Sequence, residues 1–167
     1  MQRSNPNPDA LKVLVVADDS DTTKSFAELL TLHGHAARVA LDGASSLQLA
    51  DADPPDVMLL DLRALGLSGC EVARLVRERW VGRAGRPLLV AVAGGAAQDQ
   101  DARMAAGRAR FDLDLVNPVD SAVLIGLLER ACRIRRLFAP PTPAVDHDSA
   151  PEGEPRSGSH RLLGDSR

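Results

Sequence analysis

Three aspartates at the ends of two apolar segments are the residues whose types and positions most clearly suggest chemistry. Asp18 and Asp19 follow the apolar segment 12–17, and Asp61 follows the segment 57–60. If these segments form neighbouring parallel strands, their carboxyl ends lie at one edge of a sheet and the three carboxylates converge in one acidic crevice. Like charges at such short range are costly to keep ionised without a cation.

Mg²⁺ is the simplest cation for such a crevice, because this hard ion takes one or two carboxylates together with waters and a substrate phosphate. A helix cap or a loop position is the alternative interpretation of any single aspartate, and for Asp19 taken alone it is the preferred one. Three carboxylates at matching strand ends favour a shared metal site over three separate roles.

The segments around these aspartates alternate between strand patterns and helix patterns. The run 12–17 is a continuous β-branched and apolar stretch, typical of a strand covered on both faces. Ser68 and Glu71 have the spacing of a capping box ahead of an apolar helical stripe. Such alternation predicts an α/β protein with a doubly wound, five-stranded parallel sheet, because right-handed crossovers place helices on both faces. The predicted strands are 12–17, 36–41, 57–60, 88–93 and 113–116, and the predicted helices are 21–33, 43–50, the segment from Ser68 to about Trp80, 96–106 and 121–138.

Length and composition predict one folded domain. At 167 residues the chain has room for one domain of ordinary size, and with only 2% aromatic residues its core must consist mainly of Leu, Val and Ala. We expect a flexible segment at 1–10, the folded domain at 11–138 and a disordered tail at 139–167. The tail is rich in Pro, Gly and charged residues, so it cannot bury enough apolar area to offset the entropy of ordering.

Charge and hydropathy limit the possible partners. The formal net charge of −3 gives no electrostatic reason to expect nucleic acid or an anionic membrane as a partner. No apolar run approaches the roughly 20 residues that span a bilayer, and the amino terminus lacks the apolar centre of a signal peptide. Cys70 and Cys132 are too few for a disulfide framework and are interpreted as reduced thiols. We therefore expect a soluble, cytoplasmic protein.

Four motifs together resemble the response-regulator receiver domain of two-component signalling. They are VVADDSD, PDVMLLDL, LSGCEVAR and LVNPVD, and the resemblance extends over about residues 11–133. It implies a flavodoxin-like (βα)5 fold. It also implies that Asp61 accepts a phosphoryl group from a histidine kinase or a phosphotransfer protein, and that Mg²⁺ is the cofactor. Asp19, Asp61 and the backbone carbonyl of Arg63 would hold this ion, with Asp18 acting mainly through water.

Several positions depart from the family pattern, so the resemblance is to an atypical receiver. The fourth strand of the family usually ends in Thr or Ser, whose hydroxyl bonds the phosphoryl group, but this chain has Ala93. The family places Lys before Pro in the fifth strand, and this chain has Asn117 there. Asp114 stands where an aromatic side chain is common, and Leu65 where a loop Pro is frequent. The usual parts of the phosphorylation switch are therefore absent.

In the family a Lys supplies a positive charge at the site, and this chain has only one evident residue that could replace it. The chain has two lysines, Lys12 and Lys24, and neither lies where it could serve. Arg63 could reach back to Asp61 and form a bidentate pair with a carboxylate or phosphoryl group. A solvated loop arginine is an equally open interpretation of Arg63.

Two functional hypotheses of different classes follow from this pattern. The first is a single-domain response regulator that is phosphorylated on Asp61 with impaired efficiency, because losing one positioned donor at such a site costs about 2.7–4 kcal/mol. The alternative is a pseudo-receiver that acts only as a protein-interaction module. Adding phosphate from a small-molecule donor in the presence of Mg²⁺ discriminates the two.

An unrelated enzyme on the same fold is not favoured. No Gly-rich phosphate loop follows the first strand, and Asp18 and Asp19 would repel a diphosphate. No helix-turn-helix pattern follows residue 138, so DNA binding lacks support. We expect no enzymatic activity beyond self-catalysed phosphotransfer and dephosphorylation, no organic cofactor and no nucleic-acid partner. The sequence does not identify the downstream protein partner.

Overall fold

The computed structural model of the chain describes residues 10–63, 68–83, 85–94 and 109–138. The predicted segments 1–10 (apart from residue 10), 96–106 and 139–167 lie outside the described residues, as does Leu65. The predictions made for these segments therefore stay predictions.

The described elements follow the predicted alternation closely. β3 ends one residue later than predicted, so Asp61 is the last residue of a strand rather than the first residue of a loop. The strands are β1 (Lys12–Val16), β2 (Ala36–Ala40), β3 (Val57–Asp61), β4 (Leu88–Gly94) and β5 (Leu113–Asn117). The helices are α1 (Ser20–Leu32), α2 (Gly43–Ala52), α3 (Gly69–Arg79) and α5 (Ser121–Phe138).

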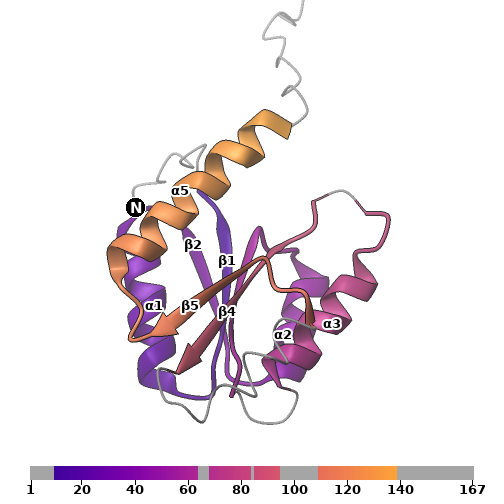
Figure 1. Ribbon diagram of the computed structural model, residues 1–167, viewed down its shortest axis with the longest axis horizontal. Helices are drawn as coiled ribbons and strands as arrows, with labels where there is room; N and C mark the ends of the chain where they lie inside the picture. The colour runs from indigo at the N-terminus through magenta and orange to yellow at the C-terminus, as the bar shows by residue number, and fades with distance from the viewer. Residues whose placement is uncertain (1–9, 64–67, 84, 95–108, 139–167) are drawn as a thin grey trace, which may run out of the picture.

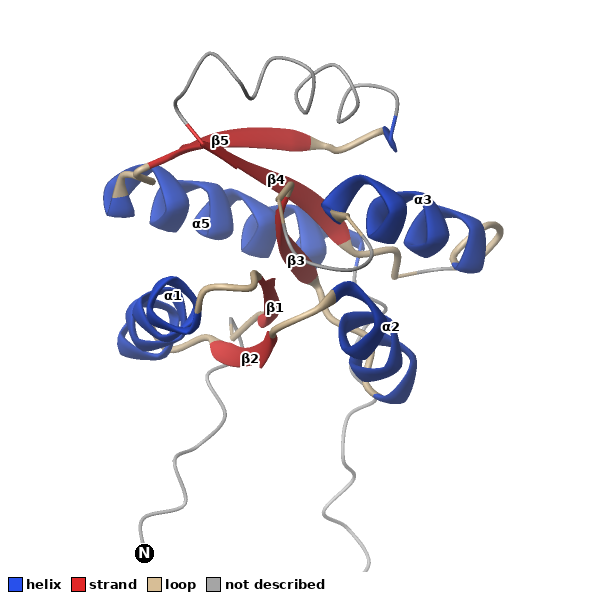
Figure 2. Ribbon diagram, turned by 90° about the horizontal axis from the view of Figure 1, so that it is seen from below, coloured by secondary structure: helices blue, strands red, loops and turns tan. Residues whose placement is uncertain are grey.

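The five strands form one parallel sheet in the order β2-β1-β3-β4-β5, which confirms the predicted doubly wound fold. β4 and β5 lie side by side and run in the same direction (Figure 1). β3 lies at the centre of the sheet, between β1 and β4 (Figure 2). The chain order reverses at β1 and β3, and a ligand crevice is expected at the carboxyl ends of strands at such a point.

Helices cover both faces of the sheet, with α1 and α5 on one face and α2 and α3 on the other (Figure 2). Each face has its own apolar core, because successive strand residues point to opposite faces. The core under α2 and α3 contains Leu14, Met58 and Val72. The core under α1 and α5 contains Leu59 and Leu124. Leu, Val and Ala dominate both cores, as the low aromatic content predicts.

Side-chain caps explain where the helices begin. The Ser68 hydroxyl accepts a hydrogen bond from the backbone N–H of Glu71, and the Glu71 carboxylate accepts one from the backbone N–H of Ser68. This confirms the predicted capping box. Asp42 caps α2 by accepting a hydrogen bond from the backbone N–H of Ser45 at 2.8 Å. At the other end of α3, Trp80 is only 5% exposed and packs into the core under α2 and α3.

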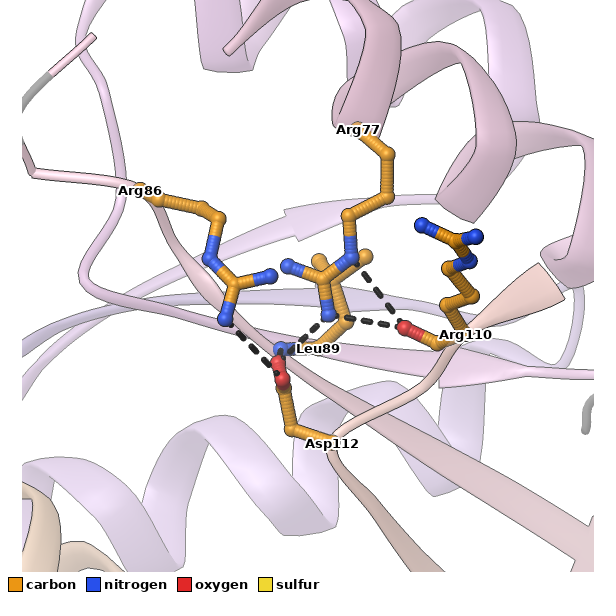
Figure 3. A network of polar contacts seen from close by, with 5 residues as sticks. All are labelled: Arg77, Arg86, Leu89, Arg110 and Asp112. Atoms are coloured by element: carbon orange, nitrogen blue, oxygen red, sulfur yellow. Dashed lines mark hydrogen bonds and ion pairs between the residues drawn. The ribbon is translucent and has the colours of Figure 1, made fainter. Parts of the chain in front are cut away.

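An arginine–aspartate network ties the start of β5 to α3 and β4 (Figure 3). The Asp112 carboxylate forms ion pairs with Arg77 Nη2 at 2.7 Å and, at the longer distance of 3.3 Å, with Arg86. It also accepts a hydrogen bond from the backbone N–H of Leu89 at 2.8 Å. Arg77 also donates through Nε and Nη2 to the carbonyl of Arg110, at 3.1 and 2.8 Å. Because Arg110 has a φ of 58°, its backbone turns in the left-handed region just before the strand. The network fixes where β5 enters the sheet.

Candidate functional site

Asp61 occupies the carboxyl end of the central strand. It is partly buried and pairs in register with Val92 of β4. On the other side of β3, the last register pair joins Val16 of β1 to Leu60. The chain of β1 reaches Asp18 and Asp19 just beyond this pair, so the backbones of all three aspartates lie at one edge of two adjacent strands. The predicted convergence of their side chains in one crevice stays a prediction.

Asp19 is the N-cap residue of α1. Its Oδ1 accepts a hydrogen bond from the backbone N–H of Asp21 at 3.2 Å, and its Oδ2 accepts one from the backbone N–H of Thr22 at 3.1 Å. The Thr22 hydroxyl donates a further hydrogen bond to Oδ2. This hydroxyl, followed by the N–H groups of Asp21 and Thr22, holds the pKa of the Asp19 carboxyl below its usual range. The cap interpretation of Asp19 is thus confirmed.

The metal site predicted at Asp18, Asp19 and Asp61 depends on whether their side-chain oxygens lie close enough together to bind one ion. Within the described part of the chain, no group of three or more His, Cys, Asp or Glu side chains is close enough together to hold a metal ion. The ligand set of Asp18, Asp19 and Asp61 with the carbonyl of Arg63 therefore stays a prediction. The donor chemistry fits Mg²⁺, which needs only one or two carboxylates, but the oxygens of Asp19 are already used by the cap.

Arg63 contacts Asp61 through its backbone. The backbone N–H of Arg63 donates a hydrogen bond to Asp61 Oδ1 at 2.8 Å, whereas the Arg63 side chain is exposed. Among the described residues, no Lys or Arg forms an ion pair with Asp61. Lys12 pairs instead with Asp53 at 2.6 Å, at the amino end of β1. The proposed role of Arg63 as a substitute cation stays a prediction.

The ends of β4 and β5 carry neither a hydroxyl nor a cation at Ala93 and Asn117, the positions predicted to correspond to the family's Thr or Ser and Lys. Ala93 is 3% exposed and packs beside Leu62 and Cys70. Asn117 is the last residue of β5 and pairs in register with Gly94. At these two positions the chain therefore has a methyl group and an amide, and the roles predicted for them stay predictions.

Gly69 packs directly on the backbone of Asp61, a contact that the sequence pattern did not predict. A Cβ atom at Gly69 would lie 2.6 Å from the carbonyl oxygen of Asp61 and 3.2 Å from Cα of Leu62. No real Cβ comes so close to backbone, so only glycine lets the first turn of α3 approach β3 here. The signal in the sequence is a glycine at the first position after the Ser68 cap.

A groove of about 960 Å³ lies away from this edge, between α5 and the amino ends of the strands. Leu11, Asp56 and Leu88 line it on the sheet side, and Gly126 and Ile134 on α5. None of the predicted site residues lines the groove, so we do not assign it to the chemistry of Asp61.

Comparison with protein families identifies the family to which the fold belongs. A family model described as the response regulator receiver domain matches residues 13–128. The chain belongs to this family. Receiver domains are phosphoacceptors rather than conventional enzymes, and the family typically binds Mg²⁺.

Curated relatives and solved structures agree with the family match. The chain is 32% identical over 124 residues to the transcriptional regulatory protein PrrA of Mycobacterium tuberculosis, which covers 74% of the chain and 51% of PrrA. It is 41% identical over 77 residues to the probable transcriptional regulatory protein NarL of the same species, which covers 45% of the chain and 36% of NarL. The chain therefore spans about half of the length of PrrA and about a third of that of NarL.

Among solved structures, a CheY-like receiver domain protein from Methanospirillum hungatei superimposes with a TM-score of 0.67 at 17% identity, covering 78% of this chain and 99% of that one. A receiver domain protein from Clostridium thermocellum gives 0.65 at 21% identity, with 77% and 99% coverage. At these identities the likeness concerns the fold alone. In the described residues, no helix is both long and apolar enough to cross a membrane.

Proposed function

We propose that this chain acts as a response-regulator receiver, which accepts a phosphoryl group on Asp61 from a histidine kinase or a phosphotransfer protein, with reduced efficiency. The observation that carries the proposal is that only one oxygen of the Asp61 carboxylate, at the carboxyl end of the central strand, accepts a hydrogen bond from a described residue. The Arg63 N–H anchors Oδ1, and no donor among the described residues contacts Oδ2.

Oδ2 is therefore the oxygen that attacks. It forms the new bond to phosphorus while the bond between phosphorus and the histidine nitrogen of the donor breaks, and the electron pair of that bond returns to the imidazole. The anchored Oδ1 fixes the orientation of the carboxylate during the attack. Mg²⁺, held by Asp19, Asp61 and the carbonyl of Arg63 with Asp18 acting through water, would neutralise charge on the transferred group.

Reduced efficiency follows from what surrounds the transferred group. Its equatorial oxygens gain charge in the transition state, and positioned donors stabilise that charge. Ala93 offers no hydroxyl, and Asn117 offers an amide in place of a full positive charge. The exposed Arg63 side chain is the nearest candidate to supply part of the missing charge.

The alternative function is a phosphorylation-independent pseudo-receiver that acts as a protein-interaction module. The absence of any ion pair on Asp61 among the described residues favours this candidate. In that case the acidic edge of the sheet would be a constant docking surface for a partner.

The proposal places the protein in the cytoplasm with a kinase or phosphotransfer protein as its partner and assigns it no nucleic-acid partner. Transcriptional regulation appears in the names of PrrA and NarL and is a property of those proteins. The net charge of −3 gives no electrostatic support for DNA contact by this chain.

The test is phosphorylation with acetyl phosphate and Mg²⁺, followed by intact-mass spectrometry. The wild type should gain one phosphoryl group slowly, and Asp61→Ala should gain none. Asp51→Asn, which changes an exposed aspartate of α2, is the matched control and should behave as the wild type. A wild type that stays unmodified while a standard receiver domain reacts in the same tube would favour the interaction module.

A further inference from the structure

The groove of about 960 Å³ beside α5 has apolar walls that are exposed. Leu113 at the start of β5 is 44% exposed, and Val123 and Ile134 on α5 are 54% and 58% exposed. These two α5 residues are roughly 16 Å apart along the helix, because each helical residue adds about 1.5 Å. Gly126 lies between them, and nothing is within 4 Å of a Cβ built there. Contiguous exposed apolar surface of this kind marks an interaction site in many proteins.

The chain leaves α5 next to this groove. Leu88, the first residue of β4, and Ile134, four positions before the end of α5, both line it, so α5 ends near the amino ends of the strands. Leu162 follows Phe138, the last residue of α5, by 24 positions. A flexible chain of that length has a root-mean-square span of about 25–30 Å, which is longer than the groove. Tethering would therefore give a segment around Leu162 an effective concentration of about 1 mM at the groove.

Residues 160–165, with the sequence HRLLGD, have the chemistry that the groove requires. Leu162 and Leu163 are the only two large apolar residues that are adjacent in the sequence after Phe138. The segment 1–9, which also leads to the groove because Leu11 lines it, offers Met1 as its only large apolar side chain. The leucine pair is therefore the better match for an apolar groove.

Charges at the groove match those that flank the leucines. Asp114 of β5 and Arg130 of α5 both line the groove and are exposed, and among the described residues neither forms an ion pair. Arg161 precedes the leucine pair, and Asp165 follows it after one glycine. One orientation of the segment brings Arg161 to Asp114. The same orientation brings Asp165 to Arg130. Exposed ion pairs are individually weak, so these would set the orientation while the leucines supply the affinity.

We propose that Leu162 and Leu163 dock in the groove between α5 and the amino ends of the strands, so that residues 160–165 cover this face of their own domain. The inference is independent of the proposed phosphorylation, because Asp61 lies at the opposite, carboxyl edge of the sheet. It restricts the predicted disorder of 139–167 to the residues outside 160–165. A protein partner that binds this face must displace the segment.

The test is nuclear magnetic resonance of the full ¹⁵N-labelled chain. In the double variant Leu162→Ala, Leu163→Ala, the amide signals of Leu113 and Gly126 should shift, and residues 160–165 should lose the heteronuclear Overhauser effect of an ordered segment. Val145→Ala is the matched control, because it truncates the other large apolar side chain after Phe138 and should change neither observation. These changes lie outside the family match at 13–128, so the folded domain keeps its own sequence.

A peptide added to the leucine double variant gives a second readout. A synthetic peptide with the sequence of residues 156–167 should return the groove signals to their wild-type positions, with a Kd of about 1 mM or below. The same peptide with alanine at both leucine positions should leave the signals unshifted.

The assigned orientation has its own experiment. Asp114→Arg and Arg161→Asp should each lower the docking equilibrium constant roughly threefold, because each places like charges together. The double variant with both changes exchanges the two charges and should dock as the wild type does. Arg156→Asp, which reverses a charge outside 160–165, is the control and should leave docking unchanged. A double variant that docks no better than the single variants would overturn the assigned pairing.

Two results would overturn the inference itself. If the signals of Leu113 and Gly126 are the same in the wild type and in the leucine double variant, the leucines do not occupy the groove. If these signals shift with protein concentration to the same extent in both proteins, a second copy of the chain occupies the groove instead of residues 160–165.

Discussion

Gly69 lies so close to Asp61 that a Cβ at Gly69 would be 2.6 Å from the Asp61 carbonyl oxygen. The atom it would meet belongs to the backbone of the central strand, which cannot move aside as a flexible side chain could. The first turn of α3 and Asp61 are thus fixed relative to each other.

Replacing Gly69 by alanine should therefore destabilise the protein by about 1–3 kcal/mol, the usual cost of overpacking, and should slow phosphorylation of Asp61. Urea unfolding measures the first effect and the phosphodonor assay the second. Gly126→Ala is the control, because nothing lies within 4 Å of a Cβ in that part of α5. It should stabilise the protein by about 0.5–1 kcal/mol. Equal stability of the two variants would contradict the close contact.

The Arg77–Asp112 pair should be worth more than an exposed ion pair. Both side chains are mostly buried, with exposed fractions of 14% and 21%, and Asp112 also holds the N–H of Leu89. Asp112→Ala should cost about 1.5–3 kcal/mol, because it leaves a largely buried guanidinium without its carboxylate. A double-mutant cycle with Arg77→Ala in urea unfolding measures the coupling.

The control cycle uses Arg74 and Glu78, an i,i+4 pair on the exposed side of α3 with more than half of each side chain accessible. Its coupling should be about 0.3–0.5 kcal/mol. A coupling for Arg77 and Asp112 as small as that of the exposed pair would refute the role assigned to the network in fixing β5.

Restoring the family's residues at the site should restore chemistry. The double variant Asn117→Lys, Ala93→Thr returns a cation and a hydroxyl, each of which stabilises developing phosphoryl charge, so phosphorylation should be roughly 100-fold faster or more. The Ala93 side chain is buried beside Leu62, so circular dichroism should first verify that the added volume is tolerated. A wild type that reacts as fast as the double variant would show that these positions do not impair the site.

Single changes at the same site should shift Mg²⁺ affinity in predictable directions. Asn117→Lys alone should weaken Mg²⁺ binding to the unphosphorylated protein, because it adds a competing positive charge near the carboxylates. If Arg63 acts as the substitute cation, Arg63→Ala should tighten Mg²⁺ binding and slow any residual phosphorylation. Calorimetry and the phosphodonor assay measure these effects, and an unchanged Kd for Arg63→Ala would leave Arg63 as a solvated loop residue.

The capping of α2 by Asp42 should make the free energy of unfolding depend on pH in the acidic range. The backbone N–H and then the hydroxyl of Ser45 hold the pKa of Asp42 below its ordinary value. A group whose pKa is lowered by folding stabilises the protein above its unfolded pKa, and that stabilisation is lost as the pH falls through the lower folded value. Asp42→Asn keeps a capping side chain that does not titrate.

The stability advantage of the wild type over Asp42→Asn should therefore be constant above about pH 5 and should decline below about pH 4. Urea unfolding of both proteins between these conditions measures the difference. An advantage that grows as the solution becomes more acidic would have the wrong sign and would contradict the lowered pKa.

Sequence alone predicted the features that depend on local pattern. Alternating strand and helix signals gave the sheet, and the spacing of Ser68 and Glu71 gave the start of α3. The cap interpretation of Asp19 was also available, because an aspartate before a helix is a common N-cap. Each of these depends on residues only a few positions apart.

The features that sequence did not predict depend on tertiary packing. Arg77 and Asp112 are 35 positions apart, and nothing in either segment indicates that α3 and β5 bring them together. The contact of Gly69 with the Asp61 carbonyl likewise appears only when α3 is placed on the sheet. The predicted metal ligands are an intermediate case. The pairing of β1 with β3 sets where their backbones lie, but side-chain contacts, such as those of Thr22 with Asp19, set the direction of the carboxylates.

Trp80 has an optical consequence. It is the only tryptophan in a chain without tyrosine, so almost all absorption and emission of the protein in the near ultraviolet comes from one indole ring. That ring is 5% exposed at the end of the helix whose first turn rests on Asp61. Its emission should be shifted to the blue in the folded protein, and any movement of α3 on phosphorylation should change its intensity without an added label.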